Sequence, residues 1–253
     1  MATYRKHNHS GYPNALIREA EGLALLRSEL LNANQAETIC VPEVYYVDES
    51  VLEMEAIAAG SSSDDALAKL GEGLATLHRV VQPFYGLEAD NYIGLSPQVN
   101  GRFRNWGYFF VNNRLGYQVA LIRNAGVRRE FQAILDSSAS ALESWLDARC
   151  EQPSLLHGDL WGGNALFEGH TPWLIDPAVY FGDREADVAM TEMFGGFGAA
   201  FYAAYDSVWL RSKDYPLKKE IYNLYHYLNH YNLFGGSYLD GCRRGFDLLT
   251  DMR

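Results

Sequence analysis

The sequence has little positive charge. Its 253 residues include 21 Lys and Arg against 32 Asp and Glu, which gives a formal net charge of −11 at pH 7. Proteins that bind nucleic acid normally carry a basic stripe, and the sequence has none. We therefore expect no nucleic-acid partner, although a few lysines, backbone amides and a metal ion can still hold a small anion such as a nucleotide.

Cysteines and long apolar runs are also scarce. The three cysteines, Cys40, Cys150 and Cys242, form no CxxC pair, which offers no zinc site and suits a reducing compartment. The N-terminus has no apolar segment of the kind that directs secretion. The longest uncharged run of aromatic and small residues, 193–205, is far shorter than the ~20 residues of a membrane helix. These absences predict a soluble, cytoplasmic protein with no membrane partner.

The first part of the chain is expected to mix helices and strands. Apolar residues at helical spacing predict a helix over 14–31, with Asn14 as its cap. Two β-like runs follow at 44–47 and 51–55, separated by turn residues. A Gly-Ser linker at 60–63 then leads into a helix whose leucines recur at helical spacing: Leu67, Leu70, Leu74 and Leu77.

The remainder is expected to be mainly helical, with strands at its centre. Its Gly and Pro content predicts a loop over 82–104. Three short apolar runs between Gly-rich loops predict strands: 155–157, 165–167 and 173–175. The predicted helices are 106–124, 128–149 and a helical region from Arg184 to the end, interrupted at Pro216 and at Gly235-Gly236.

The stretch HGDLWGGNALF (157–167) places an aspartate and an asparagine five residues apart in a Gly-rich turn between apolar runs. Side by side, the predicted strands would bring Asp159, Asn164 and Asp176 to one spot. Two carboxylates and an amide suit Mg²⁺, which binds oxygen ligands, keeps several waters and adds substrate phosphates. Protein kinases have this spacing of a catalytic Asp, an Asn and a later metal-binding Asp.

Other interpretations of this stretch remain open. An isolated HGD is more often structural, with its Asp capping a loop, and an HxD pair can also bind metal in a hydrolase. Here Asn164 follows Asp159 by five residues, and Asp176-Pro177 comes twelve residues later, both after apolar strands. This combination favours phosphoryl transfer.

The motifs HGDLWGGN, IDPAVYFGDREADVAM, EMFGGF and LYHYLNHYNLFGG resemble the fructosamine kinase (ketosamine kinase) family, within the aminoglycoside-phosphotransferase and protein-kinase-like superfamily. The resemblance implies an α+β, two-lobed kinase-like fold, with a small N-lobe over 1–58 and a helical C-lobe over 59–253. It also implies Mg²⁺ and ATP-dependent phosphorylation of a sugar-amine adduct, a fructosamine or ribulosamine, free or bound to a protein. Such an activity would be a deglycation repair, carried out by a monomer or weak homodimer.

The resemblance also implies roles for single residues. Asp159 would be the catalytic base, Asn164 and Asp176 the Mg²⁺ ligands, and His157 a residue that organises the loop. Lys6 would contact the nucleotide phosphates. Its helix partner would be Glu19, with Glu21 as the alternative, and the backbone of Glu55, Ala56 and Ile57 would pair with adenine.

Further residues are expected to support the catalytic loop or to lie beside the acceptor. Asp183, Arg184 and Asp187 are expected to brace the loop against the following helix. Trp161 lies inside the catalytic loop and is expected beside the acceptor, because sugars are often held against aromatic faces. His230 could also reach the acceptor.

The sequence lacks a Gly-rich loop before Lys6. Kinase-like small lobes normally begin with a β-hairpin whose Gly-rich turn covers the phosphates, and a two-stranded hairpin cannot fit in the five residues that precede Lys6. Either the start lies downstream of the real one, or the protein lacks this lid. The missing loop leaves open a non-catalytic kinase-like binding protein as an alternative. A second alternative is a kinase for another small molecule such as an aminoglycoside or choline, because the tyrosine-rich C-terminal half could also hold an amine acceptor.

Overall fold

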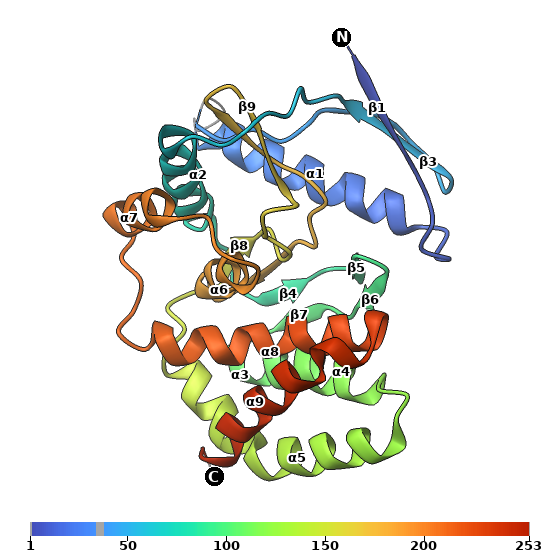
Figure 1. Cartoon of the computed structure of the whole chain (residues 1–253), viewed down its shortest axis with the longest axis vertical. Coiled ribbons are helices and arrows are strands. Elements are labelled where there is room, and N and C mark those ends of the chain that lie inside the picture. The colour runs from blue at the N-terminus through green and yellow to red at the C-terminus, as the bar shows by residue number, and fades with distance from the viewer. Residues whose placement is uncertain (1, 34–37, 253) are drawn as a thin grey trace.

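The computed structural model describes residues 2–33 and 38–252. Its N-terminal part is a three-stranded antiparallel sheet in the order β1 (Thr3–His7), β3 (Val51–Glu55), β2 (Val44–Val47), with helix α1 (Ala15–Asn32) beside it. Figure 1 shows this sheet and α1 at the end of the molecule that holds the N-terminus. In the described residues β1 is the first strand, and this small sheet with α1 is consistent with the small N-lobe that the sequence predicts.

The predicted elements of this part are largely confirmed. Strands β2 and β3 have the predicted bounds, and α1 is shifted by one residue. Asn14 occupies the N-cap position of α1 as predicted, but its side chain makes no capping hydrogen bond and instead accepts one from the Tyr92 hydroxyl. Helix α2 (Asp64–Leu77) follows the linker, and Ser63 caps it by accepting from the Ala66 N–H at 3.2 Å.

The segment 82–104 is not the predicted loop. It forms four strands of three residues each: β4 (Tyr85–Leu87), β5 (Asn91–Ile93), β6 (Ser96–Gln98) and β7 (Gly101–Phe103). Strand β4 approaches β7 so closely at Gly86, which pairs with Arg102, that a Cβ on Gly86 would lie 2.1 Å from the Gly101 carbonyl oxygen. The glycines that suggested a loop are here what lets two strands approach.

The strands around the predicted catalytic loop pair differently from the sequence interpretation. Strand β8 (Ser154–Leu156) pairs with β11 (Tyr180–Gly182), a strand that the sequence did not predict, in the sheet β7-β4-β11-β8. The other two predicted strands form a separate hairpin, β9 (Ala165–Glu168) with β10 (Thr171–Leu174). The prediction that all three strands lie side by side is therefore wrong.

Helices make up the end of the molecule that holds the C-terminus (Figure 1). The predicted helix 106–124 is three pieces: α3 (Trp106–Phe109), a π-helical stretch η1 (Phe110–Gly116) and α4 (Tyr117–Ala120). The later elements are α5 (Ala125–Asp147), α6 (Glu185–Met193), α7 (Ala199–Val208), α8 (Tyr215–Phe234), the 3₁₀ turn η2 (Gly236–Tyr238) and α9 (Leu239–Thr250). Pro216 does not interrupt a helix but lies in the first turn of α8, where its missing N–H costs nothing.

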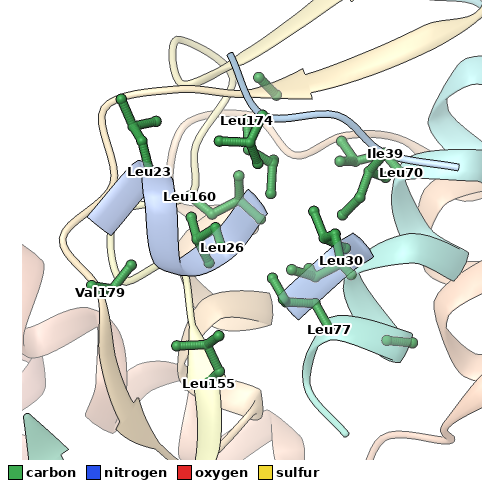
Figure 2. Close-up of a cluster of buried hydrophobic side chains, with 14 of the residues drawn as sticks. Leu23, Leu26, Leu30, Ile39, Leu70, Leu77, Leu155, Leu160, Leu174 and Val179 are labelled. Carbon is green, nitrogen blue, oxygen red and sulfur yellow. The ribbon is translucent and has the colours of Figure 1, made fainter. Parts of the chain in front are cut away.

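One hydrophobic core joins the small lobe to the strands of the larger part. Figure 2 shows Leu23, Leu26 and Leu30 of α1 close to side chains of α2 and of the strand region. Leu160, which lies between Asp159 and Trp161, is fully buried in this core. The Leu160 side chain therefore anchors the predicted catalytic loop by packing against α1. No helix in the described ranges is long and apolar enough to cross a membrane.

Candidate active site

The loop after β8 brings Asp159 and Asn164 together. The Asn164 Nδ2 atom donates to the Asp159 carbonyl oxygen at 2.8 Å and to Asp159 Oδ2 at 3.2 Å. The turn needs glycine at residue 158, where φ is +84° and a Cβ would lie 2.0 Å from the Ala178 carbonyl oxygen. The pair predicted from its five-residue spacing thus forms one hydrogen-bonded unit.

His157 connects this loop to the loop that carries Asp176. Its Nε2 atom lies 2.9 Å from the Ile175 carbonyl oxygen, and its Nδ1 atom accepts from the Asp159 N–H at 3.3 Å. Burial lowers the pKa of His157, so the imidazole is neutral and donates through Nε2. A single ring therefore fixes the distance between the two loops.

Asp187 of α6 holds the loop from the other side. Its carboxylate accepts from the backbone N–H of His157 at 2.6 Å and of Gly158 at 2.8 Å. His78 Nε2 lies 3.3 Å from the same carboxylate, and His78 Nδ1 lies 2.8 Å from the Tyr205 hydroxyl. Burial alone would raise the pKa of Asp187, but these hydrogen bonds lower it below its ordinary value. His78 was missed, since nothing in a lone histidine 109 residues away signals this contact.

Asp176 has a strained backbone and an open side chain. It is the one non-glycine residue in the described chain with positive φ, at +51°. Such strain persists where the surrounding structure enforces it, and it is often found at functional sites. Here the flanking Ile175 is tied on both sides, through its carbonyl to His157 and through its N–H to the Asn164 carbonyl at 3.1 Å.

Lys6 of β1 lies between two carboxylates. Its Nζ atom is 2.9 Å from both carboxylate oxygens of Glu19 and 3.0 Å from Asp176 Oδ1. Burial lowers the pKa of Lys6, but the two carboxylates more than offset this and leave the pKa above its ordinary value. The alternative partner, Glu21, instead pairs with Arg18 at the surface at 2.7 Å. The structure therefore brings Lys6 together with Glu19 and not with Glu21.

The charge state of Asp159 is set by its surroundings. Burial raises the pKa of Asp159 to about 7, although the hydrogen bond from Asn164 opposes this shift. A carboxyl with a pKa near neutrality is suited to accept and release a proton at physiological pH.

These groups line one cleft of about 270 Å³. Lys6, Glu19, Asp159, Asn164 and Asp176 all contribute to its wall, as do Trp161, Asn229 and His230. The cleft also has walls from α1 and from the β5–β6 hairpin.

Trp161 and His230 form part of an aromatic side of the cleft. Trp161 is 38% exposed and packs edge-on against Phe194, with ring centroids 5.5 Å apart. Phe194 in turn lies 5.4 Å from the His230 ring. His230 Nδ1 is 2.8 Å from the His226 carbonyl oxygen, so its Nε2 atom is the one left for a ligand.

The predicted adenine-binding segment does not line this cleft. Glu55 ends β3, and Ala56 and Ile57 follow it. The Ala56 N–H is already used, because it donates to the Ala2 carbonyl at 3.1 Å beside β1.

Asp183 and Arg184 lie outside the cleft, within the protein interior. Asp183 Oδ2 accepts from Lys218 Nζ and from the Tyr222 hydroxyl, both at 2.7 Å. Arg184 donates to the Leu210 carbonyl at 2.7 Å and lies over the Trp209 ring at 4.3 Å. These contacts join the start of α6 to α8 and to the segment after α7. Of the three residues expected to brace the predicted catalytic loop, only Asp187 contacts it.

The site offers few side-chain ligands for a metal ion. Among residues 2–33 and 38–252, no group of three His, Cys, Asp or Glu side chains is placed to hold one. Asp176 presents a 40% exposed carboxylate, and Asn164 turns its Nδ2 atom to Asp159, which leaves Oδ1 as an oxygen donor. One carboxylate and one amide suit Mg²⁺, which takes few protein ligands and completes its shell with water and phosphate oxygens.

Comparison with known proteins shows the family of this chain. The family model described as fructosamine kinase matches residues 3–251. A Vibrio parahaemolyticus relative named "Probable ketoamine kinase" is 40% identical over 228 residues, covering 88% of this chain and 76% of the relative.

Solved structures show the same fold. A Haemophilus somnus protein whose provisional name is fructosamine-3-kinase aligns with a TM-score of 0.83 at 27% identity, covering 98% of this chain and 83% of that one. The streptomycin–ATP–APH(2″)-IIa ternary complex aligns with a TM-score of 0.64 at 15% identity, covering 99% and 86%. Fold and site together define a phosphotransferase of the kinase-like class. The chain belongs to the fructosamine kinase family.

We expect Asp187→Asn to destabilise the protein. The amide would turn an NH₂ group toward the buried N–H donors of His157 and Gly158, which should lower the free energy of unfolding by about 2–4 kcal/mol. Chemical denaturation measures this. The control is Asp240→Asn, whose side chain is 84% exposed and should change stability by less than about 0.5 kcal/mol. Equal effects of the two substitutions would contradict the role of Asp187.

Proposed function

We propose that this protein transfers the terminal phosphoryl group of ATP to a sugar hydroxyl of a ketosamine. The observation that carries this proposal is the convergence of Asp159, Asn164, Asp176 and Lys6 in one cleft. The family match supports a fructosamine- or ribulosamine-type acceptor over an aminoglycoside or choline. It also supports an enzyme over a non-catalytic binding protein.

Asp159 is the proposed base. Its carboxylate accepts the proton of the attacking hydroxyl as the oxygen bonds to phosphorus, and the bond from phosphorus to the departing oxygen of ADP breaks. Asn164 holds the carboxylate in place through the 3.2 Å hydrogen bond to Oδ2. Proton transfer to a positioned base typically contributes 10²–10⁴-fold to the rate.

The opposite side of the cleft is proposed to hold the phosphates. Lys6 would contact them, and Glu19 keeps the Lys6 side chain extended toward the cleft through two 2.9 Å contacts. Asn164 Oδ1 and the Asp176 carboxylate would hold Mg²⁺, which neutralises charge on the transferring group when bound. Backbone carbonyls near Glu55 to Ile57 are proposed to meet the adenine, because the Ala56 N–H is occupied.

The acceptor is proposed to enter beside Trp161 and His230, on the aromatic side of the cleft. It can be a free ketosamine or an adduct on a protein lysine, and its phosphorylation would serve deglycation. Since ATP is the donor, we place the activity in the cytoplasm, with the protein acting as a monomer or weak homodimer.

Phosphate transfer tests the proposal. Wild-type protein incubated with Mg-ATP and a lysine-derived ketosamine should give ADP and a phosphorylated acceptor, and Asp159→Asn should lower kcat roughly 10²–10⁴-fold. Liquid chromatography with mass detection follows both products, and circular dichroism checks the fold of the variant. A binding protein would instead show a thermal shift with ATP and no transfer by either form.

The rate should rise with pH. A protonated Asp159 cannot accept a proton, so kcat/KM should increase tenfold per pH unit below about 7 and level off above it, as expected for one group with a pKa of about 7. Because burial also raises the pKa of Glu19 to about 7, the profile is repeated in Glu19→Gln. A profile that becomes flat in Glu19→Gln would show that Asp159 is not the titrating group.

Two glutamates of α1 provide a matched pair. Glu19→Gln should weaken the placement of Lys6 and lower kcat/KM for ATP on the order of tenfold, about 1.4 kcal/mol. Glu21→Gln removes only the exposed pair with Arg18 and should leave kcat/KM within about twofold. Steady-state kinetics with varied ATP measure both, and a larger loss in Glu21→Gln would reverse the assignment.

A further inference from the structure

Asn229 of α8 presents to the cleft a polar atom that has no partner among the described residues. The residue is only 2% exposed, and it lines the cleft together with Asp159 and His230. Its Oδ1 atom accepts from Gln118 Nε2 at 3.4 Å. Its Nδ2 atom has no acceptor within the described ranges, and it is not one of the fully buried unpaired atoms, so it reaches the open space of the cleft.

A relay of three amides sets which atom of Asn229 faces the cleft. Asn232 Nδ2 donates to Gln118 Oε1 at 2.8 Å and to the Gln118 carbonyl at 2.9 Å. With Oε1 occupied in this way, Gln118 turns its Nε2 atom to Asn229 Oδ1. Gln118 is completely buried, which holds the relay in one orientation. The relay therefore leaves Asn229 with its donor atom, Nδ2, toward the cleft.

A buried hydrogen-bond donor without an acceptor is energetically unfavourable. A site that contains such a donor therefore favours a ligand that places an oxygen atom beside it. The nearby carboxylate of Asp159 is already bonded to Asn164 and is the proposed base. Neither the neighbouring Trp161, whose only polar group is an indole N–H donor, nor Phe194 offers Asn229 an acceptor.

We propose that Asn229 Nδ2 donates to a hydroxyl oxygen of the acceptor's sugar other than the hydroxyl that is phosphorylated. This inference rests on the proposed function and adds a subsite to it. Asn229 is then a residue that determines specificity for polyhydroxylated acceptors, and Gln118 and Asn232 are positioning residues that act through it.

The test compares one ketosamine with its singly deoxygenated analogues. Wild-type protein should phosphorylate one analogue, which lacks the contacted hydroxyl, with kcat/KM at least roughly tenfold below the parent. In Asn229→Ala the kcat/KM for the parent ketosamine should fall to the value for that analogue, so the difference between the two substrates disappears. Loss of the difference for one analogue only is a result that a general structural defect would not give.

Controls keep the inference open to contradiction. Asn223→Ala removes another buried asparagine of α8, which bonds to the Ala189 carbonyl and does not line the cleft, so it should keep the wild-type difference. Asn232→Ala breaks the first link of the relay and should reduce the difference even if Asn229→Ala does not fold.

Two negative results have different meanings. Suppose that folded Asn229→Ala still transfers phosphate and keeps the difference in kcat/KM between the ketosamine and its analogue. This result would overturn the subsite and leave the proposed function standing. If only Asn232→Ala folds, the same result in that variant has the same meaning. Absence of transfer to any ketosamine by the wild type would overturn both.

Discussion

The site depends on one buried carboxylate that pairs two backbone N–H groups. Asp187 accepts from His157 and Gly158 in the turn where Gly158 must have positive φ to pass Ala178. Buried backbone donors require a partner, and no backbone carbonyl in the described part of the chain bonds to these two. The start of α6 therefore determines where Asp159 lies. Leu160, buried against α1, then holds the same loop from the side of the small lobe.

From this anchor the other groups follow in sequence. His157 connects the proposed catalytic loop to the Ile175 carbonyl, and the next residue, Asp176, has the strained backbone conformation. Asp176 forms an ion pair with Lys6 of the small lobe, and Glu19 of α1 holds Lys6 in this position through a second ion pair. The proposed acceptor side and phosphate side of the cleft are thus connected. His157 links the two loops by a hydrogen bond, and Asp176 links the second loop to Lys6 by an ion pair. Burial near this centre is also what gives Asp159 a pKa suited to proton transfer.

Local signals in the sequence predicted more of the fold than long-range pairing did. The bounds of β2 and β3 and the course of α1 follow from periodicity and turn residues close in the chain. The strands of 82–104 were missed because three-residue strands have no periodicity to read. Strand β11 was missed because its partners β4 and β8 are chosen by the folded structure. In the site, spacing indicated Asp159, Asn164 and Asp176, but His78 and Gln118 act through contacts 109 and 111 residues apart in the chain, which no local pattern contains.

The central claim is that a sugar hydroxyl meets Asp159 while phosphates meet Lys6 in the same cleft. A crystal structure of the wild type with a non-hydrolysable ATP analogue, Mg²⁺ and a ketosamine tests it most directly. We predict one sugar hydroxyl within hydrogen-bond distance of the Asp159 carboxylate, the metal on Asn164 and Asp176, and a phosphate oxygen beside Lys6 Nζ. A ketosamine bound outside this cleft, or a nucleotide whose phosphates avoid Lys6 and Asp176, would contradict the account.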